Sequence, residues 1–165
     1  MKNVLLFFSF LLLQTSFSQE SLKRVLKKYN SESVPYISVT DLKKDQENVV
    51  LLDTREPQEF NVSHLKNALI VGYDHFNLTK TLQKLPKDKS SKIVVYCSLG
   101  IRSEDIGEQL LKAGYTNVYN LYGGIFEWKN NGYSLINNQK KTTEKVHAFN
   151  KEWGKWLTKG IKVYE

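Results

Sequence analysis

The one cysteine of this 165-residue chain, Cys97, lies in a setting that favours nucleophilic chemistry. It directly follows the apolar run KIVVY at residues 92–96 and shortly precedes a predicted helix over residues 104–113. In open α/β sheets, reactive groups gather beyond the carboxyl ends of the strands. A thiol held there can attack an electrophile once it is ionised, because the thiolate is the nucleophilic form. Cys97 is therefore the candidate reactive residue.

The residues after this strand form a short loop that is suited to holding an anion. The loop consists of Cys97, Ser98, Leu99, Gly100, Ile101, Arg102 and Ser103. Gly100 can adopt backbone conformations that other residues avoid, so the loop can turn successive N–H groups inward beside a helix N-terminus. Arg102 adds a positive charge, and both effects lower a cysteine pKa from its usual value of about 8.5. We expect a Cys97 thiolate near neutral pH; the alternative is a buried structural cysteine.

The rest of the chain predicts strands that alternate with helices. Apolar, β-branched runs indicate buried strands, and apolar residues three or four positions apart indicate helices. The expected strands cover residues 36–39, 48–53, 68–71, 92–96 and 117–121. The expected helices cover residues 21–29, 40–45 with Thr40 as N-cap, 57–62, 76–85, 104–113 and 124–129. This alternation predicts an α/β fold over residues 34–135, with a small doubly wound, mainly parallel sheet flanked by helices.

The two ends of the chain carry different signals. Residues 1–18 combine a positive start with a short apolar run, the pattern of a secretory signal cleaved near Ser18, and we expect a periplasmic or secreted protein. The apolar run is too short for a stable membrane span, although an uncleaved tether is the alternative.

Residues 19–33 are expected to form a helix and linker. Residues 136–165 are expected to form a helical tail that packs on the domain through a stripe of apolar residues and ends in a strand over residues 161–164. The stripe consists of Val146, Phe149, Trp153, Trp156 and Leu157.

Composition narrows the possible functions. The net charge is +7, but the basic residues are scattered along the chain, which favours a solvated surface over nucleic-acid binding. A single cysteine cannot form a disulfide within the chain. In an exported protein, a lone thiol of this kind is a buried hydrophobe, an intermolecular link or a reactive group.

Several separated motifs resemble those of the rhodanese family. The cysteine loop resembles that family's pattern of Cys97, Gly100, Arg102 and Ser103 at fixed spacing. Upstream, Leu52-Asp53-Thr54-Arg55 resembles a strand-end signature, followed by Glu59-Phe60 and by Ser63-His64-Leu65-Lys66-Asn67-Ala68. The family usually has glycine at positions 63 and 67 and proline at 66, so this turn must close differently. Downstream, residues 121–128 and Gly132 resemble the closing motif.

This resemblance implies a sulfurtransferase. A small thiosulfate- or persulfide-type donor would give its sulfane sulfur to Cys97, and the resulting persulfide would pass it to a thiol, to a cyanide-type acceptor or to a protein. Neither a metal nor an organic cofactor is implied. Asp53 and Arg55 would support the loop rather than do chemistry. His64 is expected to be a hydrogen-bonded structural residue, Trp128 a core residue, and His147 a less favoured candidate for a role over the site.

Two other functions fit parts of the pattern. Phosphatases and arsenate reductases of related fold hold oxyanions in a Cys–Arg loop with five intervening residues, whereas four residues separate Cys97 from Arg102 here. The shorter loop suits a sulfur atom better than a tetrahedral anion. The second alternative is a sulfur carrier or partner-binding module without turnover, in which the tail is a docking element.

Overall fold

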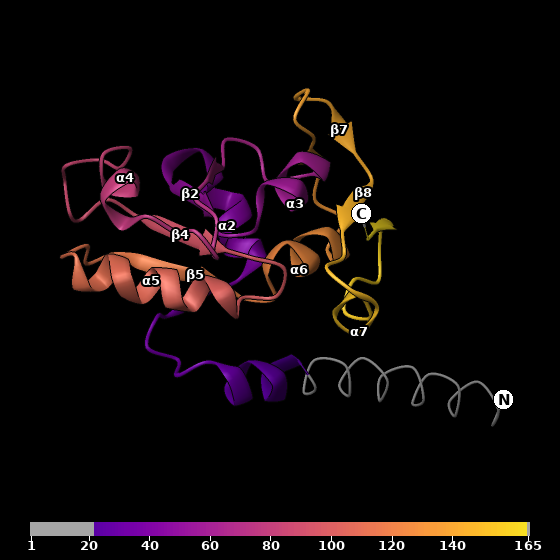
Figure 1. Cartoon of the computed structure of the whole chain (residues 1–165), viewed down its shortest axis with the longest axis horizontal. Helices are drawn as coiled ribbons and strands as arrows, with labels where there is room; N and C mark the ends of the chain where they lie inside the picture. Colours follow the sequence, from indigo (N-terminus) through magenta and orange to yellow (C-terminus); the bar gives the residue numbers. More distant parts are fainter. Residues whose placement is uncertain (1–21, 165) are drawn as a thin grey trace, which may run out of the picture. The chain divides into compact units, whose positions relative to one another are not determined.

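The computed structural model describes residues 22–164 and divides the chain into two compact units. The first unit runs to Ser31, and within it residues 22–29 form the expected helix. The second unit, Glu32–Glu165, contains the sheet and the tail (Figure 1). The expected signal segment and its cleavage near Ser18 lie outside the described residues. Among residues 22–164, no helix is long and apolar enough to cross a membrane.

A five-stranded parallel sheet forms the centre of the second unit. Its strands lie in the order β1-β5-β4-β2-β3, and every neighbouring pair is parallel. Their bounds are β1 Tyr36–Ile37, β2 Val50–Asp53, β3 Leu69–Ile70, β4 Ile93–Tyr96 and β5 Val118–Leu121. Since β4 has the strands β5 and β2 on its two sides, the residue that follows it emerges at the middle of the sheet edge. The predicted α/β class with a mainly parallel sheet is confirmed.

Four helices of the second unit connect these strands, and a fifth, α6, follows β5. Their bounds are α2 Val39–Asp45, α3 Pro57–Val62, α4 Leu78–Leu82, α5 Arg102–Lys112 and α6 Gly124–Asn130, and a short 3-10 helix covers Gln46–Asn48. The expected N-cap of α2 is wrong, because Ser38 rather than Thr40 accepts the hydrogen bond from the Asp41 N–H at 3.0 Å. The helix α4 is shorter than expected, since Asn77 caps its start by accepting from the Lys80 N–H.

The apolar side chains of the buried strands form the core beside the sheet. Leu52, Ile93, Val95 and Val118 pack together on the face that α5 covers with Ile106 and Leu110. In Figure 1, α5 runs along β5 and β4, in agreement with its contacts. Gly107 allows this close approach, because a Cβ there would lie 2.9 Å from the Val34 side chain. The cysteine loop lies between β4 and α5. This packing therefore fixes the two ends of the loop relative to each other.

The turn after α3 closes without the two glycines that the rhodanese family usually has there. Asn67 adopts a left-handed backbone conformation with φ of 67°, and Ser63 is extended with φ of −169°. Asparagine enters the left-handed region more readily than most residues. The Asn67 side chain also donates to Glu47 at 3.2 Å. Asparagine thus replaces glycine at the position that needs a positive φ.

The C-terminal tail is not the helical segment that its apolar spacing predicts. It contains the hairpin of β6 Leu135–Ile136 and β7 Thr142–Thr143, the parallel pair of β8 Lys145–His147 and β9 Ile161–Val163, and one short helix, α7 Lys151–Gly154. Phe149 has φ of 64°, which interrupts any helix through the stripe, and the Asn150 side chain then caps α7. Val146, Ala148 and Leu157 are nevertheless fully buried. The tail is tied to α6 by the Lys129–Glu144 ion pair and by a hydrogen bond from Asn130 to the Trp156 carbonyl.

Candidate active site at Cys97

Cys97 lies at the carboxyl edge of the sheet, where three strands end side by side. It follows β4 directly, and its neighbour Tyr96 is in register with Asp53 at the end of β2. The Thr54 N–H donates to the Tyr96 carbonyl at 2.9 Å, so the two strand ends remain joined beyond the sheet. Four residues then lead to α5, which begins at Arg102. The loop is therefore anchored at both ends by regular structure.

A backbone amide of the loop points at the sulfur. The Gly100 N–H donates to Cys97 Sγ at 3.1 Å. Gly100 has φ of 103°, which strains any other residue, and an added Cβ would lie 3.1 Å from the Leu121 carbonyl oxygen. Asn120 Nδ2 donates to the Gly100 carbonyl at 2.8 Å, while Asn120 Oδ1 accepts from Ser103 Oγ at 2.8 Å. Asn120 was not predicted as a site residue; from β5 it braces the middle of the loop at Gly100 and its C-terminal end at Ser103.

The N-terminus of α6 holds the loop's carbonyl groups. The Ile125 N–H donates to the Cys97 carbonyl at 2.9 Å, and the Phe126 N–H donates to the Ser98 carbonyl at 3.2 Å. Gly124 makes this approach possible, because a Cβ there would collide with the Cys97 carbonyl oxygen and lie 2.7 Å from Ser98 backbone atoms. These two hydrogen bonds attach the first residues of the loop to the start of α6.

Arg102 is fixed by a carboxylate that arrives from α3. Its guanidinium makes a two-point contact with Glu59, with both N–O distances 2.8 Å, and it also donates to Ser98 Oγ at 3.2 Å. The Glu59 side chain is 2% exposed and that of Arg102 is 18% exposed, so the ion pair is largely shielded from water. Glu59 belongs to the Glu59-Phe60 motif, but its pairing with Arg102 was not predicted. Its capping box with Glu56 orients it at the start of α3.

Burial and charge act in opposite directions on Cys97. Burial by itself raises the pKa of the Cys97 thiol, but the positive charge of Arg102 and hydrogen bonds from Ser103 and Gly100 outweigh it, so the pKa lies below its usual value. Burial alone would also raise the pKa of Glu59, yet Arg102, Arg55 and the Glu56 N–H lower it on balance. Arg102 keeps a raised pKa despite burial, because Glu59 and the Cys97 thiolate surround it. The arrangement favours an ionised sulfur.

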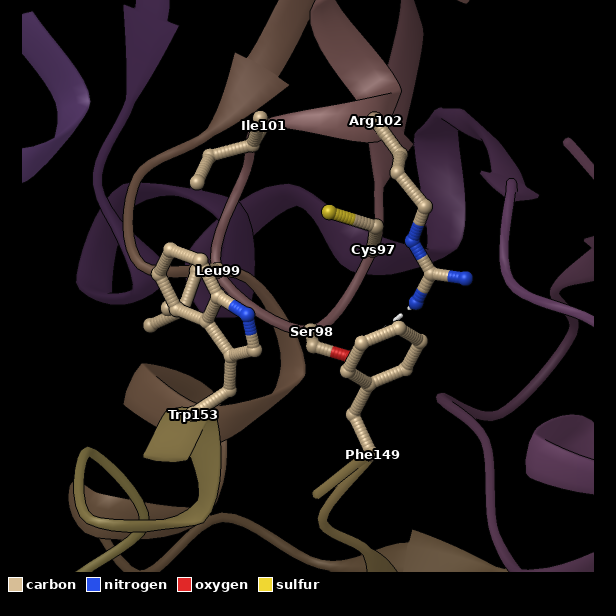
Figure 2. A pocket seen from close by; sticks show the side chains of 7 residues that line it. All are labelled: Cys97, Ser98, Leu99, Ile101, Arg102, Phe149 and Trp153. Atoms are coloured by element: carbon tan, nitrogen blue, oxygen red, sulfur yellow. Dashed lines mark hydrogen bonds between the residues drawn. The ribbon is translucent and has the colours of Figure 1, made fainter. Parts of the chain in front are cut away.

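A pocket of about 190 Å³ opens onto Cys97. Its walls are Cys97, Ser98, Leu99, Ile101, Arg102, Phe149 and Trp153. Figure 2 shows the rings of Phe149 and Trp153 rising from the tail toward the loop that carries the sulfur. Cys97 is 2% exposed, so this pocket is where a reactant would meet it. Both aromatic residues were expected in a docking stripe, and their place at the site was not predicted, because nothing local links positions 149 and 153 to position 97.

The expected supporting residues occupy the neighbouring turn. Asp53 and Arg55 form a fully buried ion pair with an N–O distance of 2.6 Å, and Arg55 also donates to the Ser63 carbonyl at 2.7 Å. They stabilise the segment between β2 and α3, which in turn presents Glu59. They do not line the pocket. Their contact with the region of the loop is indirect, through the Tyr96 ring, whose centroid lies 5.9 Å from the Arg55 guanidinium carbon.

The histidines lie away from the sulfur. His64 stacks on Phe60 with ring centroids 3.7 Å apart, and its Nδ1 lies 2.9 Å from the Phe60 carbonyl oxygen, a structural setting of the kind expected. Burial lowers the pKa of His64. His147 Nδ1 accepts from the Phe149 N–H at 3.2 Å but does not line the pocket, and His75 is exposed. Among residues 22–164, no cluster of three histidine, cysteine or acidic side chains could hold a metal ion.

Similar solved structures show the same fold. A rhodanese-related protein from Thermoplasma volcanium matches with a TM-score of 0.55 and 28% identity, covering 62% of this chain and 97% of that one. A thiosulfate sulfurtransferase from Pseudomonas aeruginosa matches with a TM-score of 0.59 and 20% identity, over 85% of this chain and 26% of that one. At that identity the second likeness concerns the fold alone.

Sequence relatives match about half of this chain. A tRNA uridine(34) hydroxylase from Hamiltonella defensa subsp. Acyrthosiphon pisum is 39% identical over 92 residues, which are 54% of this chain but 26% of that protein. A protein of the same name from Cytophaga hutchinsonii is 35% identical, over 52% of this chain and 28% of that one. The chain thus spans about a quarter of the length of these relatives. The family model of the rhodanese-like domain matches residues 38–131, more than half of the chain, and the protein therefore belongs to the rhodanese-like domain family.

Proposed function

We propose that this protein is a sulfurtransferase in which Cys97 carries the transferred sulfur as a persulfide. The observation that carries the proposal is the hydrogen bond from the Gly100 N–H to Cys97 Sγ at 3.1 Å, made beside the charge of Arg102. A loop that stabilises a thiolate also suits a persulfide, an anion whose charge lies on the sulfur bonded to Cys97 Sγ. The lowered pKa of Cys97 increases the share of thiolate, which is the nucleophilic form of the side chain.

The proposed reaction has two displacement steps. In the first, the Cys97 thiolate attacks the outer sulfur of a donor such as thiosulfate. A new S–S bond forms on Cys97, the S–S bond of the donor breaks, and sulfite leaves with the electron pair. In the second step, an acceptor thiolate or cyanide attacks the outer sulfur of the persulfide and releases the Cys97 thiolate. Each step conserves atoms and electrons, so no redox partner is needed.

The activity in the names of the sequence relatives is not added to this proposal. The hydroxylases share about a quarter of their length with this chain. A whole-protein activity cannot be assigned from that share, so hydroxylation of tRNA is not proposed. The four-residue spacing between Cys97 and Arg102 and the apolar pocket walls also favour a sulfur atom over a phosphate-sized oxyanion.

Steady-state turnover tests the proposal. Purified protein is incubated with thiosulfate or an organic sulfane-sulfur donor together with cyanide or a dithiol, and release of thiocyanate or sulfide is followed. We expect many turnovers for the wild type and none above background for Cys97→Ser, with Ser63→Ala, which lies outside the pocket, as a folded control. Turnover that persists in Cys97→Ser would contradict the proposal. Loading of one sulfur without further turnover would instead favour the carrier module.

We also propose export of the mature protein, on the sequence pattern of residues 1–18 alone. N-terminal sequencing of the chain recovered from a secreting host should then begin close to residue 19. Recovery of the intact N-terminus from the same fraction would contradict cleavage.

A further inference from the structure

The pocket at Cys97 has an apolar wall that the proposed transfer from thiosulfate does not use. Leu99 and Ile101 come from the loop, and Phe149 and Trp153 come from the tail. Together they make up more than half of the residues that line the cavity. Figure 2 shows the two rings on the tail side of the sulfur. An incoming molecule therefore meets aromatic surface on its way to Cys97.

Phe149 is held in this position against its own backbone preference. Its φ of 64° lies in the left-handed region, which is uncommon for a bulky residue. The Phe149 N–H donates to His147 Nδ1 at 3.2 Å. The centroid of the Phe149 ring lies 5.1 Å from the guanidinium carbon of Arg102. The side chain remains 45% exposed, so burial of this ring does not account for the strained backbone. A role of the ring at the pocket would account for it.

The charges at the pocket disfavour a dianion. Among the described residues that line the cavity, Arg102 is the one cation, and Glu59 already engages it through two contacts of 2.8 Å. The nucleophilic thiolate adds a further negative charge. Thiosulfate would bring two negative charges into a partly dry site in which the one positive charge is already balanced.

We propose that the pocket selects donors that carry their sulfane sulfur on an apolar or aromatic group and bear at most one negative charge. Phe149 and Trp153 are the specificity residues, and they contact that group while Cys97 attacks the sulfur. The inference rests on the proposed sulfur transfer and narrows its substrate class. For an aryl thiosulfonate, the Cys97 thiolate bonds to the outer sulfur, the S–S bond of the donor breaks, and the aryl sulfinate leaves with the electron pair.

Three donors with the same outer sulfur separate charge from apolar surface. Thiosulfate is a dianion, methanethiosulfonate a small monoanion and benzenethiosulfonate an aryl monoanion. The second-order rate of sulfur loading on Cys97 is measured for each donor and divided by its rate with free cysteine, which corrects for intrinsic reactivity. We expect the wild type to prefer benzenethiosulfonate over thiosulfate by about tenfold or more, since burial of a phenyl group is worth that factor.

Variants of the tail test the assignment of the two rings. Phe149→Ala and Trp153→Ala should each lower the preference for benzenethiosulfonate over methanethiosulfonate by about fivefold, which is the scale of one aromatic contact. Trp153→Phe should retain most of the preference, and Ile161→Ala, an exposed tail residue outside the pocket, should leave it unchanged. Thermal unfolding of each variant identifies any that has lost its fold.

The outcomes distinguish this inference from the proposed function. If thiosulfate loads Cys97 as well as the aryl donor after correction, or if neither alanine variant changes the ratio of the two thiosulfonates, the inference is overturned while sulfur transfer stands. If no donor loads Cys97, the proposed function itself fails.

Discussion

At the scale of single residues, the reactivity of Cys97 results from two opposing effects. A sulfur that is 2% exposed should hold its proton, because burial disfavours the thiolate. Arg102, Ser103 and Gly100 reverse this preference and lower the pKa. The largest of these favourable effects is the charge of Arg102, so it is the one to remove in a test.

Arg102→Gln should raise the pKa of Cys97. The rate of alkylation by iodoacetamide, followed against pH, should rise at a higher pH in this variant than in the wild type. Lys112→Gln removes the same charge at the exposed end of the same helix and should leave the midpoint in place. Arg102→Gln alone leaves the buried Glu59 carboxylate without its cation. The double variant Arg102→Gln/Glu59→Gln removes that carboxylate as well, so that a buried unpaired charge does not unfold the protein. An unchanged midpoint in both Arg102 variants would refute the electrostatic explanation.

The residues of the loop could be predicted because they are contiguous. Cys97, Gly100 and Arg102 carry their meaning in their spacing, and the structure brings them together. Glu59 and Asn120 could not be assigned roles in the same way, since each reaches the loop from another element. A buried charge pair such as Glu59 with Arg102 depends on which elements become neighbours, and one sequence does not contain that information.

At the scale of elements, the site depends on how closely α6 approaches the cysteine loop. The N–H groups of Ile125 and Phe126 bind two loop carbonyls, and Gly124 leaves room for them. Gly124 also has φ of 56°, so a side chain there meets both backbone strain and a collision.

Gly124→Ala should therefore destabilise the protein by about 3 kcal/mol and slow sulfur loading. Gly114→Ala is a matched control, because Gly114 also has a positive φ, of 93°, but has nothing within 4 Å of an added Cβ. It should cost about 1 kcal/mol and leave loading unchanged. Urea unfolding and the loading rate check both expectations. Equal effects of the two substitutions would show that the contact between Gly124 and the loop is unimportant.

Glu59 connects α3 to the start of α5 and should make stability depend on pH. Its pKa is lowered in the folded protein, so its contribution is complete above the unfolded value of about 4.3 and is lost as the pH falls through the folded value. Glu59→Gln should cost about 3 kcal/mol at pH 7, since it breaks a buried pair. The difference from the wild type in the free energy of unfolding should shrink below about pH 4.3.

Urea unfolding at several pH values measures that difference. Glu47→Gln is the control, because it changes a carboxylate of the same type whose ion pair with Lys66 is largely exposed. It should have little effect at any pH. A Glu59→Gln difference that stays constant from pH 7 down to the acid limit would contradict the role of its charge.

The strands and helices of the domain were easier to predict than the tail. The buried strands and α3 were predicted because apolar runs and Pro57 mark them locally. In the tail, apolar residues at helical spacing belong instead to β8, α7 and the segments that follow each of them. Pairing of β8 with β9 and the left-handed Phe149 override the local pattern, and both depend on contacts far along the chain.

At the scale of the whole molecule, the tail adds residues from beyond the family domain to the wall of the pocket. The rhodanese-like match ends at residue 131, whereas Phe149 and Trp153 lie beyond it and still line the pocket. The domain and the tail belong to the same compact unit. In the proposed function, the loop supplies the reactive sulfur and the tail supplies the surface that a reactant meets.

The most direct test of the account is the mass of the protein after treatment with a sulfane-sulfur donor. The wild type should gain the mass of one sulfur atom, peptide mapping should place it on Cys97, and cyanide should remove it. Cys97→Ser should gain nothing under the same conditions. An unchanged wild-type mass with every donor, or the same gain in Cys97→Ser, would contradict the claim that Cys97 carries the sulfur.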